Sequence, residues 1–196
     1  ILKNYKFKKN MEILDIGCGN GKQIIQAIKI LKKSGRIVGI DLSKKSIIKL
    51  NTFKNRKSLK NLKLINGSMD DIRLFFKKGK ISGKFDLIHS TYAFYYSQNF
   101  IKILKYLKNK LNKNGKFIIT FPGGKNSLKS DYLNEKDKTK LSTLKYDTNS
   151  LVQVFKKNFI SVYKRKFINK LVVKNYDDLI NFTRSAGFYS KLKEIN

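Results

Sequence analysis

The stretch Glu12-Ile-Leu-Asp-Ile-Gly-Cys-Gly-Asn-Gly21 decides how this chain folds, because it joins an apolar segment to a glycine-rich loop. Its first five residues suit a short buried strand, and the next five carry glycine at every second position. Apolar residues then recur at helical spacing over 22–33, which predicts an amphipathic helix. Glycine permits a tight turn and a close ligand, and the start of a helix offers unpaired N–H groups. The stretch therefore predicts a strand, a ligand-binding loop and a helix in succession.

The same alternation continues outward from this stretch. Further strands are expected over the ranges 36–40, 62–65, 85–88 and 116–121. Further helices are expected from Ser43 onward and over the ranges 70–77, 98–111, 150–157 and 176–186. Strands that alternate with helices favour a parallel sheet with helices on both faces. We therefore predict an α/β fold built on a doubly wound, mainly parallel, Rossmann-like sheet.

The predicted organisation is a single domain over 1–196. A cofactor-binding core is expected over 10–122, an irregular insertion or lid over 123–149, and C-terminal substrate-side elements over 150–196. The chain starts at an isoleucine rather than a methionine, so we expect elements to be truncated at both ends.

Composition excludes several classes of protein. The single Cys rules out an internal disulfide framework and a Cys-based zinc site, and we predict no metal. No apolar run approaches 18 residues, so no transmembrane segment is expected. The first ten residues lack an apolar signal core, which favours a cytoplasmic protein.

The formal charge of +31 suggests an acidic partner, but a simpler origin is available. Only five of the 44 basic residues are Arg, whereas nucleic-acid readers favour Arg for bidentate and stacking contacts. Lys, Asn and Ile all have A/T-rich codons, and the Lys residues are spread along the whole chain. Codon bias with a solvated surface is therefore preferred. Nucleic acid, an anionic membrane surface or a carrier protein remain as alternative partners.

Acidic residues are scarce, and two of them follow predicted strands. Asp15 precedes the glycine loop, and Asp41 ends the second strand 24 residues after Gly17. An acid at that second place can accept hydrogen bonds from both hydroxyls of a ribose. The dinucleotide fingerprint would need glycine where Lys22 stands, and no NTPase phosphate loop is present. The alternative is a plain tight turn with Asp41 as a helix cap, which the strand–loop–helix–strand context disfavours.

Five segments in order resemble the motifs of class I S-adenosylmethionine-dependent methyltransferases. They are the ranges 13–21, 39–43, 66–72, 85–90 and 107–120. The resemblance covers about 10–122. It implies a methyltransferase that uses S-adenosylmethionine as its cofactor.

The resemblance also implies roles for single residues. Asp15 and the glycine loop would hold the methionine part of the cofactor, Asp41 would hold the ribose, and residues 68–70 would frame the adenine. Many relatives carry Asp in place of Ser68, so the adenine contact is left open between Ser68, Asp70 and the backbone. The full set expected to bind cofactor is Asp15, Gly17, Cys18, Gly19, Asn20, Gly21, Asp41, Leu42, Ser68, Met69, Asp70 and Ser90.

Two residues after the fourth strand are candidate catalytic groups. His89 has an intrinsic pKa that suits a general base, and Tyr92 is an alternative pocket group. The structural alternatives are a packed strand-end His and a Tyr that covers the cofactor. A sulfonium methyl group is already activated, so positioning is the main requirement and a base is needed only for some acceptors.

Absent motifs narrow the acceptor. No [DN]-P-P-[YFW] segment follows the fourth strand, which disfavours exocyclic amino groups of bases. The only Cys lies in the glycine loop, so the nucleophile for cytosine C5 is missing. Glu is found only at 12, 135 and 194, so the paired-Glu pattern of arginine methyltransferases is also missing.

The segment 167–189 is loosely similar to the C-terminal part of the trans-aconitate and malonyl-carrier-protein methyltransferase groups. The predicted function is therefore methyl transfer to an oxygen, or as second choice a nitrogen, of a small metabolite or carrier-bound acid. The alternatives are an RNA-modifying methyltransferase that uses the basic surface, and a non-catalytic cofactor-binding protein.

Overall fold

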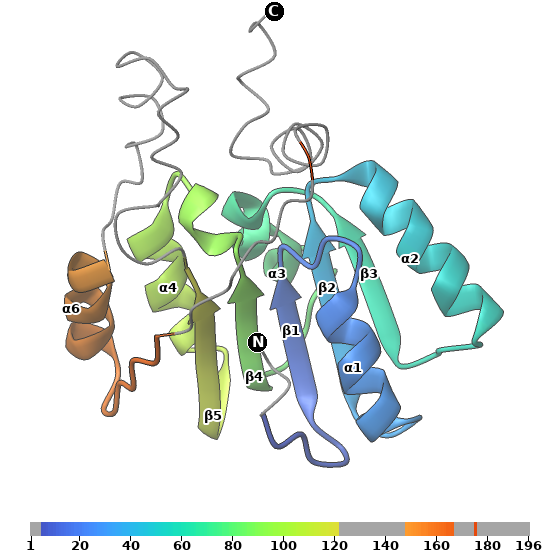
Figure 1. Ribbon diagram of the computed structural model, residues 1–196, viewed down its shortest axis with the longest axis horizontal. Helices are drawn as coiled ribbons and strands as arrows, with labels where there is room; N and C mark the ends of the chain where they lie inside the picture. The colour runs from blue at the N-terminus through green and yellow to red at the C-terminus, as the bar shows by residue number, and fades with distance from the viewer. Residues whose placement is uncertain (1–4, 122–147, 167–174, 176–196) are drawn as a thin grey trace, which may run out of the picture. The chain divides into compact units, whose positions relative to one another are not determined.

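A five-stranded parallel sheet forms the centre of the molecule (Figure 1). The computed structural model describes residues 5–121, 148–166 and 175. The strands are β1 (Glu12–Ile16), β2 (Arg36–Asp41), β3 (Leu62–Asn66), β4 (Phe85–Thr91) and β5 (Leu111–Thr120). Their order across the sheet is β3-β2-β1-β4-β5, so the order in which the chain adds strands reverses between β1 and β4. The predicted doubly wound, parallel sheet is confirmed.

Helices cover both faces of the sheet (Figure 1). One face carries α1 (Lys22–Leu31) and α2 (Lys44–Arg56), and the other carries α3 (Ile72–Lys77) and α4 (Phe100–Lys108). Helix α6 (Thr148–Asn158) contacts α4, and the short 3-10 turns η2 (Met69–Asp71) and η3 (Phe94–Tyr96) follow β3 and β4. Among the described residues, no helix is long and apolar enough to cross a membrane.

Two apolar clusters, one on each face, hold these layers together. Leu31 of α1 and Ile37 of β2 belong to one cluster, and Phe75 of α3 and Leu104 of α4 belong to the other. Strands β1 and β2 are almost wholly buried because helices cover both of their faces. Inside this apolar layer, Asp15 on β1 lies directly opposite His89 on β4.

The expected bounds of α4 and β5 were wrong. Helix α4 ends at Lys108 instead of residue 111, and β5 begins at Leu111 instead of residue 116. The pairs Phe85–Leu111 and Leu87–Lys116 enclose an irregularity, because β4 advances by two residues there while β5 advances by five. A Cβ at Gly115 would lie 2.8 Å from the carbonyl oxygen of Phe85. Asn114-Gly115, a pair typical of turns, therefore forms part of a bulge within the strand.

The chain divides into two compact units. The sheet and its helices belong to residues 1–124 and 146–162, and the second unit comprises 125–145 and 163–196. The expected lid over 123–149 and the expected helix over 176–186 lie outside the described residues, apart from Thr148 and Asn149 at the start of α6.

Candidate functional site

The candidate site lies at the carboxyl ends of the strands, beside the point where the sheet order reverses (Figure 1). Ligands of open α/β sheets bind at such a switch point, because the loops on its two sides diverge. Here the glycine loop follows β1, Asp41 ends β2, and η2 and η3 follow β3 and β4. The predicted cofactor residues are therefore brought to one edge.

Left-handed backbone shapes the glycine loop. Gly17, Gly19 and Gly21 have φ angles of 74°, 51° and 77°, which residues with a side chain rarely adopt. The backbone N–H groups of Gly17 and Cys18 both donate to the carbonyl oxygen of Ile40, at 2.8 and 3.0 Å. The loop is therefore fixed to the end of β2.

The loop also lies against the segment after β4. A Cβ at Gly17 would come within 2.2 Å of the Ala93 Cβ, whereas a Cβ at Gly19 would meet nothing within 4 Å. Glycine is therefore required at 17 for close packing as well as for its backbone angle.

Asp41 links the glycine loop to the start of α2. Its Oδ2 accepts a hydrogen bond from the Gly19 N–H at 2.6 Å, and its Oδ1 accepts one from the Ser43 N–H at 2.8 Å. A carboxylate oxygen has about two acceptor positions, so each oxygen can take another donor. The two hydroxyls of a ribose are suitable donors.

A cavity of about 90 Å³ lies next to Asp41. Its lining residues are Gly17, Ile40, Asp41, Leu42, Gly67, Ser68, Met69, Asp70 and Tyr96. Typical small-molecule pockets have volumes of about 300–1,000 Å³, so this cavity suits one part of a larger ligand. Its walls include six of the predicted cofactor residues together with Ile40, Gly67 and Tyr96, which were not predicted.

Ser68 and Asp70 make local hydrogen bonds beside the cavity. The Ser68 Oγ accepts from the Asp70 N–H at 3.1 Å and so caps η2. The Asp70 Oδ1 accepts from the Ser97 hydroxyl at 2.6 Å, and its Oδ2 accepts from the Gln98 N–H at 3.1 Å. Asp70 therefore ties the segment after β3 to the segment after β4. Sequence reasoning missed Ser97, for which the sequence carries no motif.

Asp15 and His89 form a buried polar pair between β1 and β4. The His89 Nδ1 lies 3.4 Å from the Asp15 Oδ1, and both side chains are 2% exposed. Within the described part of the chain, the Asp15 Oδ2 has no hydrogen-bond partner. Burial, with a smaller contribution from Asp41, raises the pKa of Asp15 well above its ordinary value. Burial lowers the pKa of His89 to about 3, so its ring is neutral at pH 7.

The other predicted site residues near His89 and the glycine loop occupy different environments. Ser90 is fully buried and its hydroxyl donates to the carbonyl oxygen of Ile16 at 2.7 Å, so it links β4 to the end of β1. Tyr92 is 41% exposed and has a φ of 55°. His89 lies inside the sheet, so the geometry favours a His89 that positions Asp15 over a His89 that contacts an acceptor.

Burial, followed by the charges of Asp15 and Asp41, raises the pKa of the Cys18 thiol, which excludes a reactive thiolate there.

Residues 7–167 match the family model described as a methyltransferase domain. The match spans most of the chain, so the chain belongs to this family. Its fold is that of the class I S-adenosylmethionine-dependent methyltransferases, as predicted from the five segments.

Two curated relatives are similar to about 60% of this chain. A protein of Saccharolobus solfataricus, named a probable cobalt-precorrin-6B C(15)-methyltransferase (decarboxylating), is 31% identical over 121 residues, covering 60% of this chain and 56% of its own. An uncharacterized protein of Haemophilus influenzae is 30% identical over 122 residues, covering 61% of this chain and 44% of its own. The chain spans about half the length of these relatives.

Solved structures share the fold at low sequence identity. A SAM dependent methyltransferase from Aquifex aeolicus has a TM-score of 0.59 at 19% identity, covering 83% of this chain and 79% of that one. The YcgJ protein from Bacillus subtilis has a TM-score of 0.57 at 18% identity, covering 80% of this chain and 64% of that one. These likenesses establish the fold of the sheet and its helices.

The residues at the site fit S-adenosylmethionine, the cofactor of this class. That molecule carries an ammonium and a sulfonium cation, and the unpartnered Asp15 carboxylate oxygen is a buried acceptor that needs a cation. Its ribose has two hydroxyls that suit the Asp41 carboxylate, and at Gly19 the loop leaves open space where a side chain would stand. Among the described residues, no group of three or more His, Cys, Asp or Glu could hold a metal ion.

Proposed function

We propose that this chain transfers a methyl group from S-adenosylmethionine to an oxygen, or as second choice a nitrogen, of a small metabolite or carrier-bound acid. The observation that carries the proposal is the buried Asp15 carboxylate, which has an unpartnered oxygen beneath the glycine loop. A buried carboxylate is costly unless a cation offsets it. A cationic cofactor that lies on this loop removes that cost when it binds.

Each residue of the site has a role in holding the cofactor. The bound cofactor supplies an activated methyl group. Asp15 holds the cationic methionine part, Asp41 accepts hydrogen bonds from the ribose hydroxyls, and the cavity beside Met69 takes the base. These contacts fix the direction of the methyl group, and positioning of this kind provides most of the acceleration in such displacements.

The polarity of the cavity supports a small acceptor over RNA. Asp41 and Asp70 line the cavity, and neither Lys nor Arg belongs to its lining. An RNA acceptor would need cations around the cofactor to hold its phosphates. The motifs excluded by the sequence point the same way, because those for base amino groups and cytosine C5 are missing.

Calorimetric titration with S-adenosylmethionine tests the cofactor half of the proposal. We expect Asp41→Ala to weaken binding at least tenfold, because hydrogen bonds to a charged group contribute about 1.5–3 kcal/mol each. Asp71→Ala is the matched control, since it removes an exposed acid from the neighbouring turn, and it should change the affinity less than twofold. Unchanged binding in a correctly folded Asp41→Ala protein would sink the proposal.

The same proteins, incubated with methyl-labelled cofactor and a panel of acids, phenols, amines and RNA, test the acceptor half. Transfer to an oxygen of a carboxylic acid gives a base-labile methyl ester, whereas an N-methyl group survives base. Methyl label found on RNA alone would show that RNA is the acceptor, in place of the small metabolite or carrier-bound acid proposed above. Cofactor binding without transfer to any member of the panel would favour the non-catalytic alternative.

A further inference from the structure

A second hollow, of about 640 Å³, lies on the face of the sheet that carries α3 and α4. We call it the cationic groove and define it by Arg73, Leu74, Phe76, Lys77, Tyr106 and Lys110. It opens between the last turns of α3 and α4, next to the residues that lead into β4 and β5. It is therefore at the amino edge of the parallel sheet, whereas the cofactor cavity is at the carboxyl edge.

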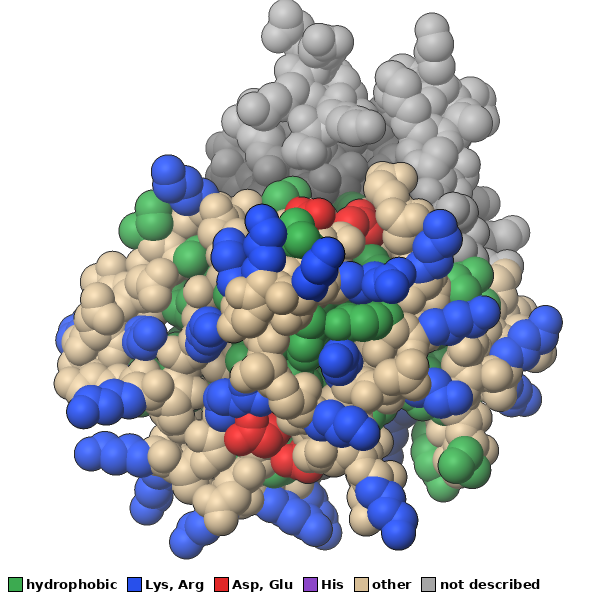
Figure 2. Space-filling model, turned by 180° about the vertical axis from the view of Figure 1, so that it is seen from behind, with side chains coloured by type: hydrophobic (Ala, Val, Ile, Leu, Met, Phe, Trp, Pro, Cys, Tyr) green, Lys and Arg blue, Asp and Glu red, His purple; other side chains and the backbone are tan. Residues whose placement is uncertain are grey.

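Hydrophobic side chains are exposed near the centre of this face and are surrounded by Lys and Arg (Figure 2). The groove has an aromatic floor, in which the Phe76 and Tyr106 rings meet edge to face with centroids 5.6 Å apart. The Lys110 Nζ lies 4.5 Å from the Phe76 centroid and 5.2 Å from that of Tyr106. The Arg73 Cζ lies 5.4 Å from the Tyr106 centroid. The rings therefore hold two cations in defined positions.

These cations have no acidic partner in the described part of the chain. The lining contains no Asp or Glu. The ion pairs among the described residues are Arg36–Glu12 and Asp15–His89, and neither pair includes a residue of the groove. Another acid at the same edge, Asp86, accepts hydrogen bonds from the Glu12 N–H and the Asn112 side chain. The cationic groove therefore presents uncompensated positive charge.

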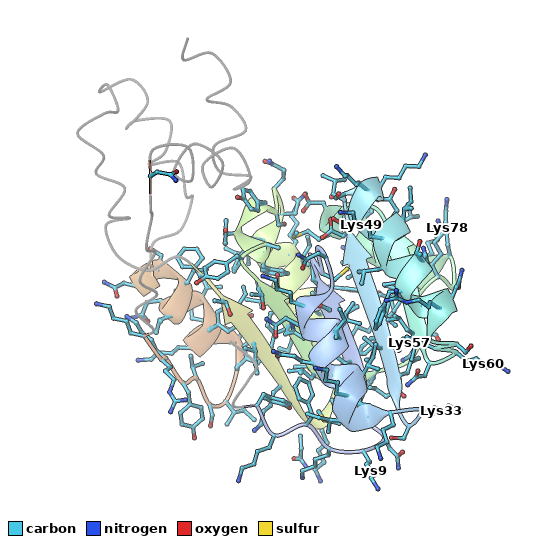
Figure 3. The ribbon with its side chains drawn as sticks, turned by 45° about the vertical axis from the view of Figure 1, so that its right-hand side comes forward. Lys9, Lys33, Lys49, Lys57, Lys60 and Lys78 are labelled. Atoms are coloured by element: carbon cyan, nitrogen blue, oxygen red, sulfur yellow. The ribbon has the colours of Figure 1, made fainter. Side chains whose placement is uncertain are left out.

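Among the described residues outside the groove, Arg36, Lys80 and Lys116 each lie over a single ring, whereas in the groove Arg73 and Lys110 share the Phe76–Tyr106 pair. Figure 3 shows Lys33, Lys57 and Lys60 directed outward from the molecule, and none of them lies over a ring within the described residues. Codon bias accounts for such scattered lysines. It does not account for Arg73, one of only five Arg in the chain, placed over an aromatic ring.

We propose that the cationic groove binds single-stranded RNA. Fixed cations can hold phosphates, and an Arg that lies on an aromatic ring offers its guanidinium plane to an unpaired base. A duplex hides its base faces, whereas RNA loops, bulges and ends expose them. A flat anionic membrane would not enter a hollow, and an acidic peptide would use the cations without needing the Arg–Tyr pair. The proposal does not depend on methyl transfer, since the groove is at the opposite edge of the sheet.

Fluorescence anisotropy with a labelled ten-residue oligouridylate tests the groove. Arg73→Ala/Lys110→Ala is compared with Lys57→Ala/Lys60→Ala, which removes the same charge from the loop between α2 and β3. We expect the groove variant to lose at least tenfold in affinity and the control less than twofold. Because each phosphate contact on a single strand contributes about 0.7 to the salt slope, the groove variant should flatten that slope by about 1.4.

Tyr106→Leu separates a built site from general attraction, because it leaves the charge unchanged. We expect about a fivefold loss of RNA affinity, whereas net charge alone predicts none. Melting temperatures show which variants are folded, and the exposed single change Lys77→Ala replaces the double variant if that one unfolds. Equal losses in the groove and control variants would overturn the proposal. Tighter binding of polyglutamate, or of oligothymidylate, than of the RNA would also overturn it.

Discussion

At the scale of single residues, Asp15 and His89 respond to burial in opposite directions. Burial raises the pKa of the acid and lowers that of the imidazole to about 3. Both shifts favour the neutral forms of the two side chains. A cationic ligand favours the ionised Asp15 and therefore binds more weakly as pH falls.

The two residues make opposite contributions to stability as pH changes. The folded state holds the Asp15 proton more tightly than the unfolded state, so stability is lost as pH rises above about 3.8. The folded state resists protonation of His89, so stability is lost as pH falls from about 6.5 to about 3. In the pH range where both apply, the two effects offset each other.

Variants of the pair should separate these effects. Asp15→Asn leaves the histidine effect, so its stability should rise with pH by up to about 1.4 kcal/mol per unit between pH 3 and 6.5. His89→Leu leaves the aspartate effect, so its stability should fall as pH rises above about 3.8. Urea unfolding at several pH values measures both slopes, and comparing the variants cancels the groups they share. Parallel slopes would contradict this account.

Asp41 could be predicted from the sequence and the state of His89 could not. An acid after the second strand of such a sheet lies at the carboxyl edge whatever the side-chain packing is. The exposure of a strand-end histidine depends instead on which strand pairs with it. The register of β1 against β4 places His89 beside Asp15, and nothing in the sequence near either residue specifies that register.

At the scale of elements, the glycine loop between β1 and α1 tests how tightly the site is packed. Gly17→Ala and Gly19→Ala both force alanine into a left-handed conformation, at a cost of about 1–2 kcal/mol. Only the first also drives a Cβ into Ala93, and overpacking adds about 1–3 kcal/mol.

We therefore expect Gly17→Ala to be less stable than Gly19→Ala by about 1–3 kcal/mol in urea unfolding, for the packing reason alone. Gly19→Ala is the matched control, since its Cβ would enter open space. Equal destabilisation would show that the segment after β4 moves aside without cost.

The predicted strands match β1 to β3 to within one residue. Strand β4 continues to Thr91 instead of ending at 88, so His89 and Ser90 lie within it, and β5 begins earlier than predicted. Strands β1 to β4 read as short apolar runs between clear loop signals, so their positions follow from the sequence. The polar residues 112–115 interrupt the apolar pattern of β5, and the local sequence alone predicts a turn there. Tertiary pairing with β4 keeps them in the strand as a bulge.

At the scale of the whole molecule, the charge of +31 opposes the compact state. Salt screens repulsion between exposed charges with a Debye length of about 10 Å at 0.1 M. We expect the melting temperature to rise between low salt and about 0.3 M sodium chloride, by roughly 2–4 °C for each kcal/mol of repulsion removed. Thermal unfolding followed by circular dichroism measures this, and potassium chloride of equal ionic strength should act alike. A fall with salt would mean that surface ion pairs dominate.

The distribution of charge could be seen only in the fold. In the sequence the Lys residues are spread evenly, and the separation between Arg73, Tyr106 and Lys110 gives no sign that they meet. The crossovers after β3 and β4 bring α3 and α4 together on one face and create the cationic groove. The acids that line the cofactor cavity, Asp41 and Asp70, come from the end of β2 and from η2 after β3, at the opposite edge.

The contact between Gly17 and Ala93 has a consequence for how this sequence can diverge. A side chain at 17 is blocked while 93 carries one, so the two positions cannot change independently. Alanine at 17 would need glycine at 93 or a displaced segment after β4, in addition to a left-handed backbone that alanine adopts only at a cost. Substitutions in the glycine loop are therefore constrained by a segment more than seventy residues away, and substitutions at 93 are constrained by Gly17.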